Sequence, residues 1–440
     1  MGVLQDEFDR VLNDRFSAPN LTKAVVRRAL RHKNPSLSDE QLDAATAALS
    51  AAILKAKDSG QATISLQIDD GDPDRCVDLN DTDLADALQG MENEILSGMD
   101  GVILRSVDEL SPGVLSSLYA DASKALKHRR RQQRRFESNL YNRWKEGIDR
   151  LEMLVMIAQE AGNLFLEDVQ RAHKTADEKI PSEEFCLLDA LVRIHVRSCR
   201  IACEVLCLLK GGFADGANAR WRSLHENAVI AMFIAQHGGD VGERYLTHAA
   251  VEQYRAARQY QEHCEALGQE PLTTSELDEL ARAQQAVVAK YGEDFRGEYG
   301  WASRAIQMRS PNFADIERHL DMSRWRPYYK MACHSVHAGP QGLYFSLSVI
   351  DPAAPMLVAG ASNAGLCDPG HSAAIALMMV SAATFTAKSN IDGLVKMRVM
   401  MQLCDDIGQT FLEAHQQLEE DAALERELAH EEVNNEREEA

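Results

Sequence analysis

The stretch that decides the fold class spans residues 112–174 and reads PGVLSSLYADASKALKHRRRQQRRFESNLYNRWKEGIDRLEMLVMIAQEAGNLFLEDVQRAHK. After Pro112 it contains no further proline and few glycines. Proline and glycine are the residues that most often end a helix, and both are rare in this stretch. The stretch therefore predicts one very long helix, or two collinear helices, that crosses a domain boundary.

Helical patterns continue on both sides of this stretch, and only one segment shows clean strand alternation. The alternation at 63–68, an acidic turn at 69–74 and residues 75–79 together predict one β-hairpin. We therefore predict a mainly α fold, in which a long connecting helix joins a multi-helix bundle to a small N-terminal α/β-hairpin unit. The other predicted helices cover residues 2–15, 19–32, 38–57, about 81–97, 183–211, 216–237, 241–267, 274–291, 312–336, 370–388 and 390–432.

Composition along the chain predicts four regions. These are an N-terminal helical unit with the hairpin at 1–110, the long connecting helix at 111–175, a helical-bundle core domain at 176–412 and an acidic helical tail at 413–440. The tail holds eleven acids against two arginines, which is typical of a solvated helix end. Gly, Pro, Ser and Ala dominate the segment from Gly339 to Gly370, which predicts a long ordered connection or a cap over a pocket.

Charge and cysteine usage limit the class of protein. The 440 residues include 47 Lys and Arg against 68 Asp and Glu, a net charge of -21, which excludes a general electrostatic coat on nucleic acid. The nine cysteines are scattered, and acids rather than an apolar signal core follow Met1, so we predict a reduced, cytoplasmic protein. The uncharged window 369–387 is long enough to span a bilayer, but its serines, threonines and alanines favour a buried helix and no membrane partner.

A basic stripe lies within the long helix and could bind nucleic acid. Seven cations occur between 124 and 135 without an acid, and all but Arg129 fall within an arc of about 140° on a helix. Such a face could follow the phosphate backbone of RNA, or it could be a solvated face that pairs with the acidic tail or a partner subunit. The six candidate nucleic-acid-binding residues are Lys124, Lys127, Arg130, Arg131, Arg134 and Arg135.

Four potential metal ligands recur at i+4 in the helix predicted at 183–211: His195, Cys199, Cys203 and Cys207. A zinc site needs ligands from two elements, whereas one straight helix offers at most two neighbouring ligands. Core packing is therefore the preferred interpretation. Because metal-binding, nucleotide-binding and dinucleotide-binding motifs are all absent from the sequence, we predict no metal and no cofactor.

The densest polar cluster lies in residues 216–227, where Arg220, Arg222, His225 and Glu226 occupy about two helical turns. The spacing places Arg222 and Glu226 at i+4 and Arg222 and His225 at i+3. These residues are candidates for catalysis. Arg222 and Glu226 could equally form a structural ion pair, because charged groups stay in a core only when they are paired.

A second cluster contains His334 and His337, which share a helix face one turn apart if the helix extends to residue 337. Gly339-Pro340 then ends the helix, and the helix dipole at this C-terminus favours a protonated histidine. Both histidines are candidate catalytic residues, as a general acid or as phosphate binders. Capping of exposed carbonyls is the alternative role.

These clusters resemble a bacterial domain-of-unknown-function family, numbered 5677, over roughly residues 150–390. The family has an Arg-x-x-x-Glu pattern on one helix and a later helix that ends in Val-His-x-Gly. The matching residues here are Arg222 with Glu226, and Val336-His337 with Gly339, together with the segments 299–302 and 360–366.

The arrangement also resembles the HEPN superfamily of helical bundles, whose nuclease members carry Arg, four to six residues and then His. Arg220 and His225 have this spacing, although Trp221 replaces the polar residue that usually follows the arginine. The resemblance implies an HEPN-like bundle that cleaves RNA without metal, often as a homodimer. A ribose 2′-hydroxyl would attack the adjacent phosphate, with His225 or His337 transferring protons and Arg220 or Arg222 stabilising the developing charge.

We therefore expect a metal-independent HEPN-like endoribonuclease, or an RNA-binding effector, of a bacterial defence or stress system. The alternative is a non-catalytic helical module that senses a ligand or binds a protein, with Arg222, Glu226 and His337 in a buried network. A metal-dependent hydrolase that uses His334 and His337 is a third possibility. The role expected of residues 1–110 is recognition of a protein partner.

Overall fold

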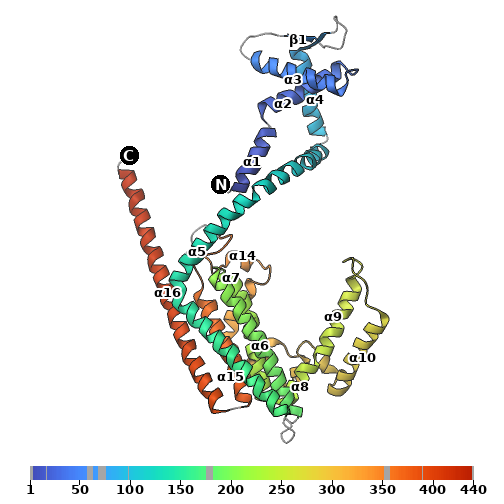
Figure 1. The fold of residues 1–440 in the computed structure, drawn as a ribbon. Helices are drawn as coiled ribbons and strands as arrows, with labels where there is room; N and C mark the ends of the chain where they lie inside the picture. The colour runs from blue at the N-terminus through green and yellow to red at the C-terminus, as the bar shows by residue number, and fades with distance from the viewer. Residues whose placement is uncertain are drawn as a thin grey trace. The chain divides into compact units, whose positions relative to one another are not determined.

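The computed structural model describes residues 3–15, 17–56, 63–67, 76–97, 99–174, 182–350, 357–388 and 390–438, and these residues are mainly α-helical (Figure 1). The chain divides into two compact units, residues 1–134 and 135–440. The long helix α5 (Met99–Lys174) contributes to both units. The predictions of a mainly α chain and of a very long helix are therefore confirmed.

The first unit contains α1 (Val3–Arg15), α2 (Ala18–Lys33), α3 (Asp39–Ala56) and α4 (Asp81–Ser97). Its core is small and consists of Val26, Leu30, Leu42, Leu49 and Leu79 with their neighbours. Strands β1 (Thr63–Gln67) and β2 (Cys76–Asn80) pair antiparallel, with Thr63 opposite Asn80 and Gln67 opposite Cys76. The hairpin thus forms where alternation predicts it, and the acidic turn at 69–74 lies outside the described residues.

Helix α5 begins earlier than Pro112, the residue from which the sequence predicts it. Its 76 residues include Pro112 in the interior. Proline removes a single backbone hydrogen bond at this point, and helical turns on both sides continue the ladder. The Ser111 hydroxyl also donates to the Val107 carbonyl oxygen at 2.6 Å. The helix therefore continues through the proline instead of starting at it.

The core of the second unit lies among the later part of α5, α6 (Ser182–Lys210), α7 (Ala214–His237), α15 (Cys367–Ala387) and α16 (Ile391–Glu438) (Figure 1). Trp144, Trp221, Phe233 and Phe411 are among its largest fully buried side chains. Helix α15 contacts α6, α7 and α16 through small residues. It is long and apolar enough to cross a membrane by length and composition, and 56% of the apolar window is buried here, as in the core helix of a soluble protein.

Two predicted helices are each divided in the structure. The pattern at 241–267 becomes α8 (Gly239–Thr247) and α9 (Ala249–His263), and the buried His248 between them bonds the Gly297 carbonyl oxygen at 2.9 Å. The pattern at 312–336 becomes α12 (Phe313–His319), η3 (Ser323–Trp325) and α13 (Arg326–His334). Asp321 has φ of 57°, a left-handed conformation that ends α12, and Pro327 lies in the first turn of α13.

The remaining elements complete the second unit. Helix α10 (Thr274–Tyr291) packs on α9, and the two form a lobe that projects from the bundle (Figure 1). The described part of 339–370 contains one short helix, α14 (Gln341–Tyr344), irregular chain and the first turn of α15. Helix α16 continues without a break from the bundle through the acidic segment to Glu438. The short elements between α10 and α12 are η1 (Glu293–Arg296), η2 (Gly300–Ala302) and α11 (Ser303–Ile306).

Candidate functional site

The basic stripe lies on α5, and all six of its side chains are exposed. Among the described residues, no ion pair involves any of the six. The Arg134 Nε donates instead to the Arg130 carbonyl oxygen at 3.2 Å, a contact within the helix. The stripe is therefore a continuous cationic surface on one helix.

The aromatic residues that follow the stripe do not extend this surface. Trp144 is 1% exposed, and its Nε1 donates to the Asn363 Oδ1 at 2.9 Å. The Tyr141 hydroxyl donates to the Asp149 Oδ1 at 2.6 Å, which raises the pKa of the phenol. Phe136 packs on the bundle core beside Gly212. A stacking platform for bases is thus not formed by these three side chains.

The polar cluster is the second candidate site, and its rim joins α7 to α13. The Arg222 Nη2 lies 3.1 Å from the Glu226 Oε1, which is the i+4 pair that the spacing predicts. The Arg222 Nη2 also donates to the Tyr329 hydroxyl at 2.8 Å, and this hydroxyl donates to the Glu226 Oε1 at 2.6 Å. Burial and the neighbouring Glu226 raise the pKa of Tyr329. The three side chains therefore form a closed hydrogen-bonded triangle.

The deeper half of the polar cluster is built around Glu317 of α12. The Glu317 Oε1 lies 3.0 Å from the His225 Nε2, and its Oε2 accepts from the Arg326 Nη1 at 2.6 Å. The side chains of His225 and Glu317 are 3% and 1% exposed. Two basic side chains thus share one buried carboxylate, which is how a charge this deep is stabilised.

Aromatic rings enclose both halves of the polar cluster. The guanidiniums of Arg222 and Arg326 each lie 5.0 Å from the centre of the Tyr329 ring. His225 has ring neighbours at 5.4 Å in Trp221 and at 5.9 Å in Tyr329. Cation–π contacts of this kind hold the guanidinium planes in place without removing their outer edges from water. The side chains of Arg222, Glu226 and Arg326 keep 24%, 30% and 30% exposure.

The chemistry available at the polar cluster follows from its charge balance and its access to solvent. Two guanidiniums face two carboxylates, and the Nε2 atom of the buried His225 is occupied by Glu317. The exposed rim at Arg222 and Arg326 can offer guanidinium edges to an anionic group. The deep half can hold α7, α12 and α13 together, which is a structural role.

The structure does not bring Arg220 and His225 together. Arg220 points to α6, where its Nε donates to Glu204, and its Nη1 donates to the Ser223 Oγ at 3.2 Å. His225 contacts Glu317 in the core instead. The five-residue spacing places the two side chains about 140° apart around α7, so they face different neighbours.

His334 and His337 occupy the end of α13 and the turn after it. The helix ends at His334, two residues before the predicted end at residue 336, and the His337 N–H still donates to the Cys333 carbonyl oxygen at 2.9 Å. His334 is half-buried and His337 is exposed. His337 is therefore the histidine of this group that solvent reaches most freely.

The sequence does not predict three of the residues that form the polar cluster. These are Glu317, Arg326 and Tyr329. Glu317 and Arg326 are nine positions apart with a helix break between them, so no helical spacing relates them. Tyr329 lies close to His334 in sequence, but its partner on α7 is about a hundred residues away. Only the packing of α12 and α13 on α7 brings these groups together.

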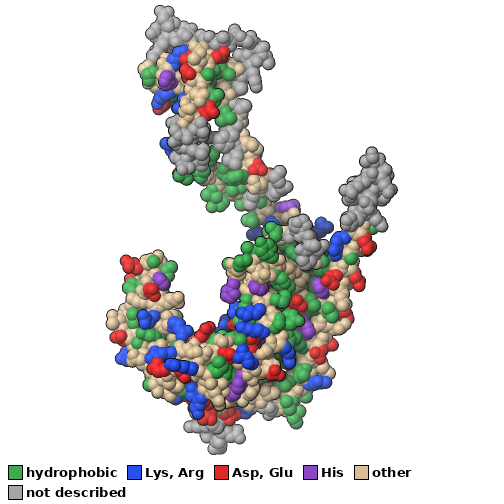
Figure 2. Space-filling view, turned by 180° about the vertical axis from the view of Figure 1, so that it is seen from behind, with side chains coloured by type: hydrophobic (Ala, Val, Ile, Leu, Met, Phe, Trp, Pro, Cys, Tyr) green, Lys and Arg blue, Asp and Glu red, His purple; other side chains and the backbone are tan. Residues whose placement is uncertain are grey.

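Cationic side chains also gather elsewhere on the second unit. Figure 2 shows Lys and Arg side chains on both flanks of a hollow between the lobe of α9 and α10 and the bundle. In the described part of the chain, no group of three or more His, Cys, Asp and Glu side chains is arranged to hold a metal ion.

Comparisons with known proteins relate one segment of the chain to a family. Comparison with curated proteins and with solved structures gives no match, so the resemblance to the HEPN superfamily finds no support there. The matched segment contains most of α6 and all of α7 to α14, and the motif at 360–366 and the basic stripe lie outside it. Residues 188–352 match the model described as a family of unknown function (DUF5677), and this segment is what the chain shares with that family.

Proposed function

We propose that this protein is an RNA-binding effector of the bacterial cytoplasm, of the kind that serves defence or stress systems, and that the basic stripe of α5 binds the RNA. The observation that supports this proposal is the exposure of all six cations along one helix face. Successive cations on such a face can each neutralise a phosphate and release its counterions. The net charge of -21 repels RNA from the rest of the surface, which confines binding to local cationic regions.

Matched arginine variants test where RNA binds. Arg130, Arg131 and Arg134 are changed together to Gln in one variant, and Arg193, Arg197 and Arg200, which are exposed on α6, are changed in the control. Fluorescence anisotropy with a labelled single-stranded RNA should show affinity lowered on the order of tenfold or more at low salt in the first variant only. If both variants bind RNA with the same affinity as the unchanged protein, RNA does not bind at the basic stripe but at another surface, for example in the hollow of Figure 2.

Metal-independent cleavage of the bound RNA, with HEPN-like chemistry in a homodimer, is the more specific form of this proposal. The supporting observation is that His337 is exposed, because a proton-transfer group must reach the ribose and phosphate. Total RNA incubated in EDTA should give discrete products with the unchanged protein and none with His337→Ala. Cleavage that persists in His337→Ala would remove this histidine from the reaction, and intact RNA with both proteins would restrict the function to binding.

A ligand-sensing or protein-binding module is the second candidate function, and the geometry of the polar cluster supports it. His225 and Glu317 are almost fully buried, which suits a network that sets the arrangement of α7, α12 and α13. A ligand with an anionic group would contact the exposed edges of Arg222 and Arg326. If Arg222→Gln binds RNA as tightly as the unchanged protein, the polar cluster is not part of the RNA site. If the variant binds RNA more weakly but keeps normal thermal stability, the polar cluster contributes to the RNA site.

A further inference from the structure

The row of His195, Cys199, Cys203 and Cys207 on α6 divides into two parts that face different surroundings. His195 is 2% exposed, and its Nε2 lies 3.1 Å from the Ser381 Oγ of α15. Cys199 is also buried, 3.8 Å from the His195 Nδ1. Cys203 and Cys207 are exposed. The first two residues therefore belong to the core, as the sequence predicts for all four, and the second two do not.

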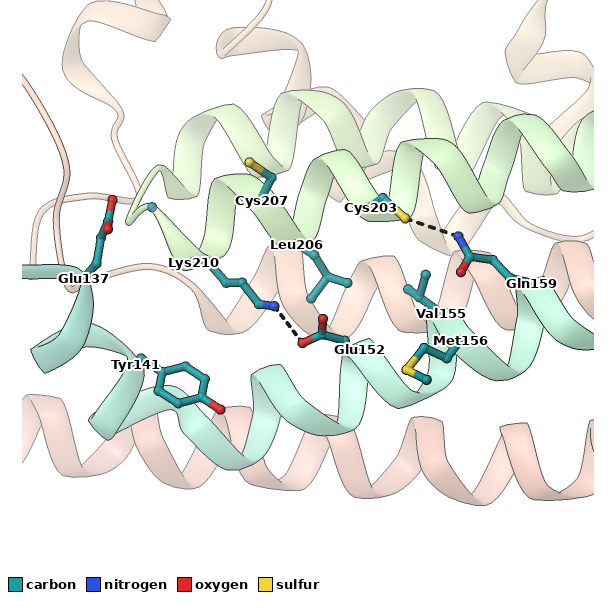
Figure 3. Close-up of a pocket in the computed structure, with 11 residues that line it drawn as sticks. Glu137, Tyr141, Glu152, Val155, Met156, Gln159, Cys203, Leu206, Cys207 and Lys210 are labelled. Atoms are coloured by element: carbon teal, nitrogen blue, oxygen red, sulfur yellow. Dashed lines mark hydrogen bonds and ion pairs between the residues drawn. The ribbon is translucent and has the colours of Figure 1, made fainter. Parts of the chain in front are cut away.

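Cys203 and Cys207 line a pocket of about 690 Å³ between α5 and α6. Figure 3 shows Cys203 facing Gln159 of α5 and Cys207 one turn further along α6, with its sulfur turned away from that of Cys203. The Gln159 Nε2 donates to the Cys203 Sγ at 3.4 Å. At the end near Lys210, the ammonium donates to the Glu152 Oε2 at 2.6 Å. Two thiols one helical turn apart thus lie in a cavity that small solutes can enter.

The spacing of these thiols favours a bridging ion over a disulfide. Residues at i and i+4 of a helix have Cβ atoms about 5–6 Å apart. A disulfide requires a Cβ separation of about 3.5–4.5 Å, so closing one here would distort α6. Two metal–sulfur bonds of about 2.3 Å each can span up to about 4.6 Å between the sulfur atoms. Side-chain rotation alone can bring two sulfurs to that separation.

We infer that Cys203 and Cys207 form a binding site for a soft, thiophilic metal ion, with Cu(I) as the physiological example. Thiolates select Cu(I), and an ion with low coordination number needs no third or fourth protein ligand. Binding replaces the two S–H protons by two Cu–S bonds and releases both protons to solvent, so the bound group carries one negative charge. The Gln159 N–H stabilises the thiolate on Cys203, and the Lys210 ammonium lines the same pocket.

Three other cysteines described in the second unit, Cys199, Cys367 and Cys404, are poorer ligands than the exposed pair. Burial raises the pKa of both Cys199 and Cys404 to about 12, and it raises that of Cys367 to about 11. Because the thiolate is the form that binds metal, a raised pKa weakens a cysteine as a ligand. Cys186 and Cys333 are half-buried and serve as controls.

Anaerobic competition for Cu(I) between the full chain and the chromophoric chelator bicinchoninate tests this inference. The unchanged protein should withdraw one Cu(I) per chain. Cys203→Ser and Cys207→Ser should each weaken the competition at least tenfold, and the Cys186→Ser/Cys333→Ser control should match the unchanged protein. Circular dichroism should confirm the fold of every variant.

Three results would overturn the inference. One is undiminished competition in the Cys203→Ser/Cys207→Ser double variant, and another is loss of binding in only one of the two single variants. The third is a chain that withdraws no Cu(I) at all. RNA binding is measured separately, so failure of the metal site leaves the proposed RNA-binding function unaffected.

Discussion

Glu317 is the residue on which the deep half of the polar cluster depends. Its carboxylate is 1% exposed and contacts both His225 and Arg326. Glu317→Gln removes the negative charge and leaves both basic groups without it, so we expect a loss of about 3 kcal/mol in the free energy of unfolding. Glu226→Gln is the control. Because Glu226 is 30% exposed and solvent screens its charge, we expect this variant to lose about 1 kcal/mol or less in the free energy of unfolding.

Urea denaturation of both variants at pH 7 measures this difference. Equal and small losses in the two variants would show that the buried carboxylate does not hold α12 to α7. The Arg222 and Glu226 pair is predictable from i+4 spacing, whereas Glu317 is not, because its partners come from other elements.

His195 should make stability depend on pH. Burial lowers its pKa from 6.5 to about 4, so the folded protein holds the ring neutral. As pH falls below 6.5 the unfolded chain binds a proton that the folded chain does not, and stability decreases until the pH reaches about 4. The loss over this window is on the order of 3 kcal/mol.

Urea denaturation of the unchanged protein and of His195→Gln at pH 7, 6 and 5 checks this expectation. Gln does not titrate in this range, so the variant should start less stable at pH 7 and show a shallower dependence on pH. Parallel curves for the two proteins would contradict the assignment of the pH dependence to His195.

Two glycines with positive φ allow the cost of backbone strain to be measured apart from the cost of a steric clash with another segment. Gly365 has φ of 76°, and an added Cβ would lie 2.1 Å from the Leu347 carbonyl oxygen. Gly268 has φ of 64°, and nothing lies within 4 Å of its Cβ position. Gly268→Ala should therefore cost about 1–2 kcal/mol for the left-handed conformation alone, and Gly365→Ala should cost clearly more.

Thermal unfolding of the two alanine variants measures the difference directly. A melting temperature lowered equally in both would mean that the segment around Gly365 moves away from Leu347 at no cost. This segment belongs to the long connection after Gly339, for which the sequence predicts order without predicting the contact.

The helices themselves are predictable to within a few residues in most cases, because apolar periodicity reports the buried face directly. Local capping agrees with this pattern at the start of α3, where the Ser38 N–H donates to the Gln41 Oε1 at 3.0 Å and the Gln41 N–H donates to the Ser38 Oγ at 3.3 Å. The breaks at His248 and Asp321 are not predictable, since a buried side chain and a left-handed residue cause them. Tertiary contacts override the local pattern at both positions.

For the whole molecule, the sequence indicates the cationic helix face but not which polar residues meet. Spacing along one helix is enough to align the six cations of the basic stripe. The polar cluster instead depends on α12 and α13 packing on α7, which spacing cannot encode. The sequence therefore supports a candidate RNA-binding surface on α5 better than it supports any candidate catalytic residue on α7.

The salt dependence of RNA affinity is the measurement that tests RNA binding by the basic stripe most directly. If all six cations contact phosphates of single-stranded RNA, log K should fall against log salt with a slope of about -4. Changing Lys124, Lys127, Arg130, Arg131, Arg134 and Arg135 to Gln should bring this slope close to zero. The same steep slope in the unchanged protein and the variant would contradict the account and place RNA on another surface.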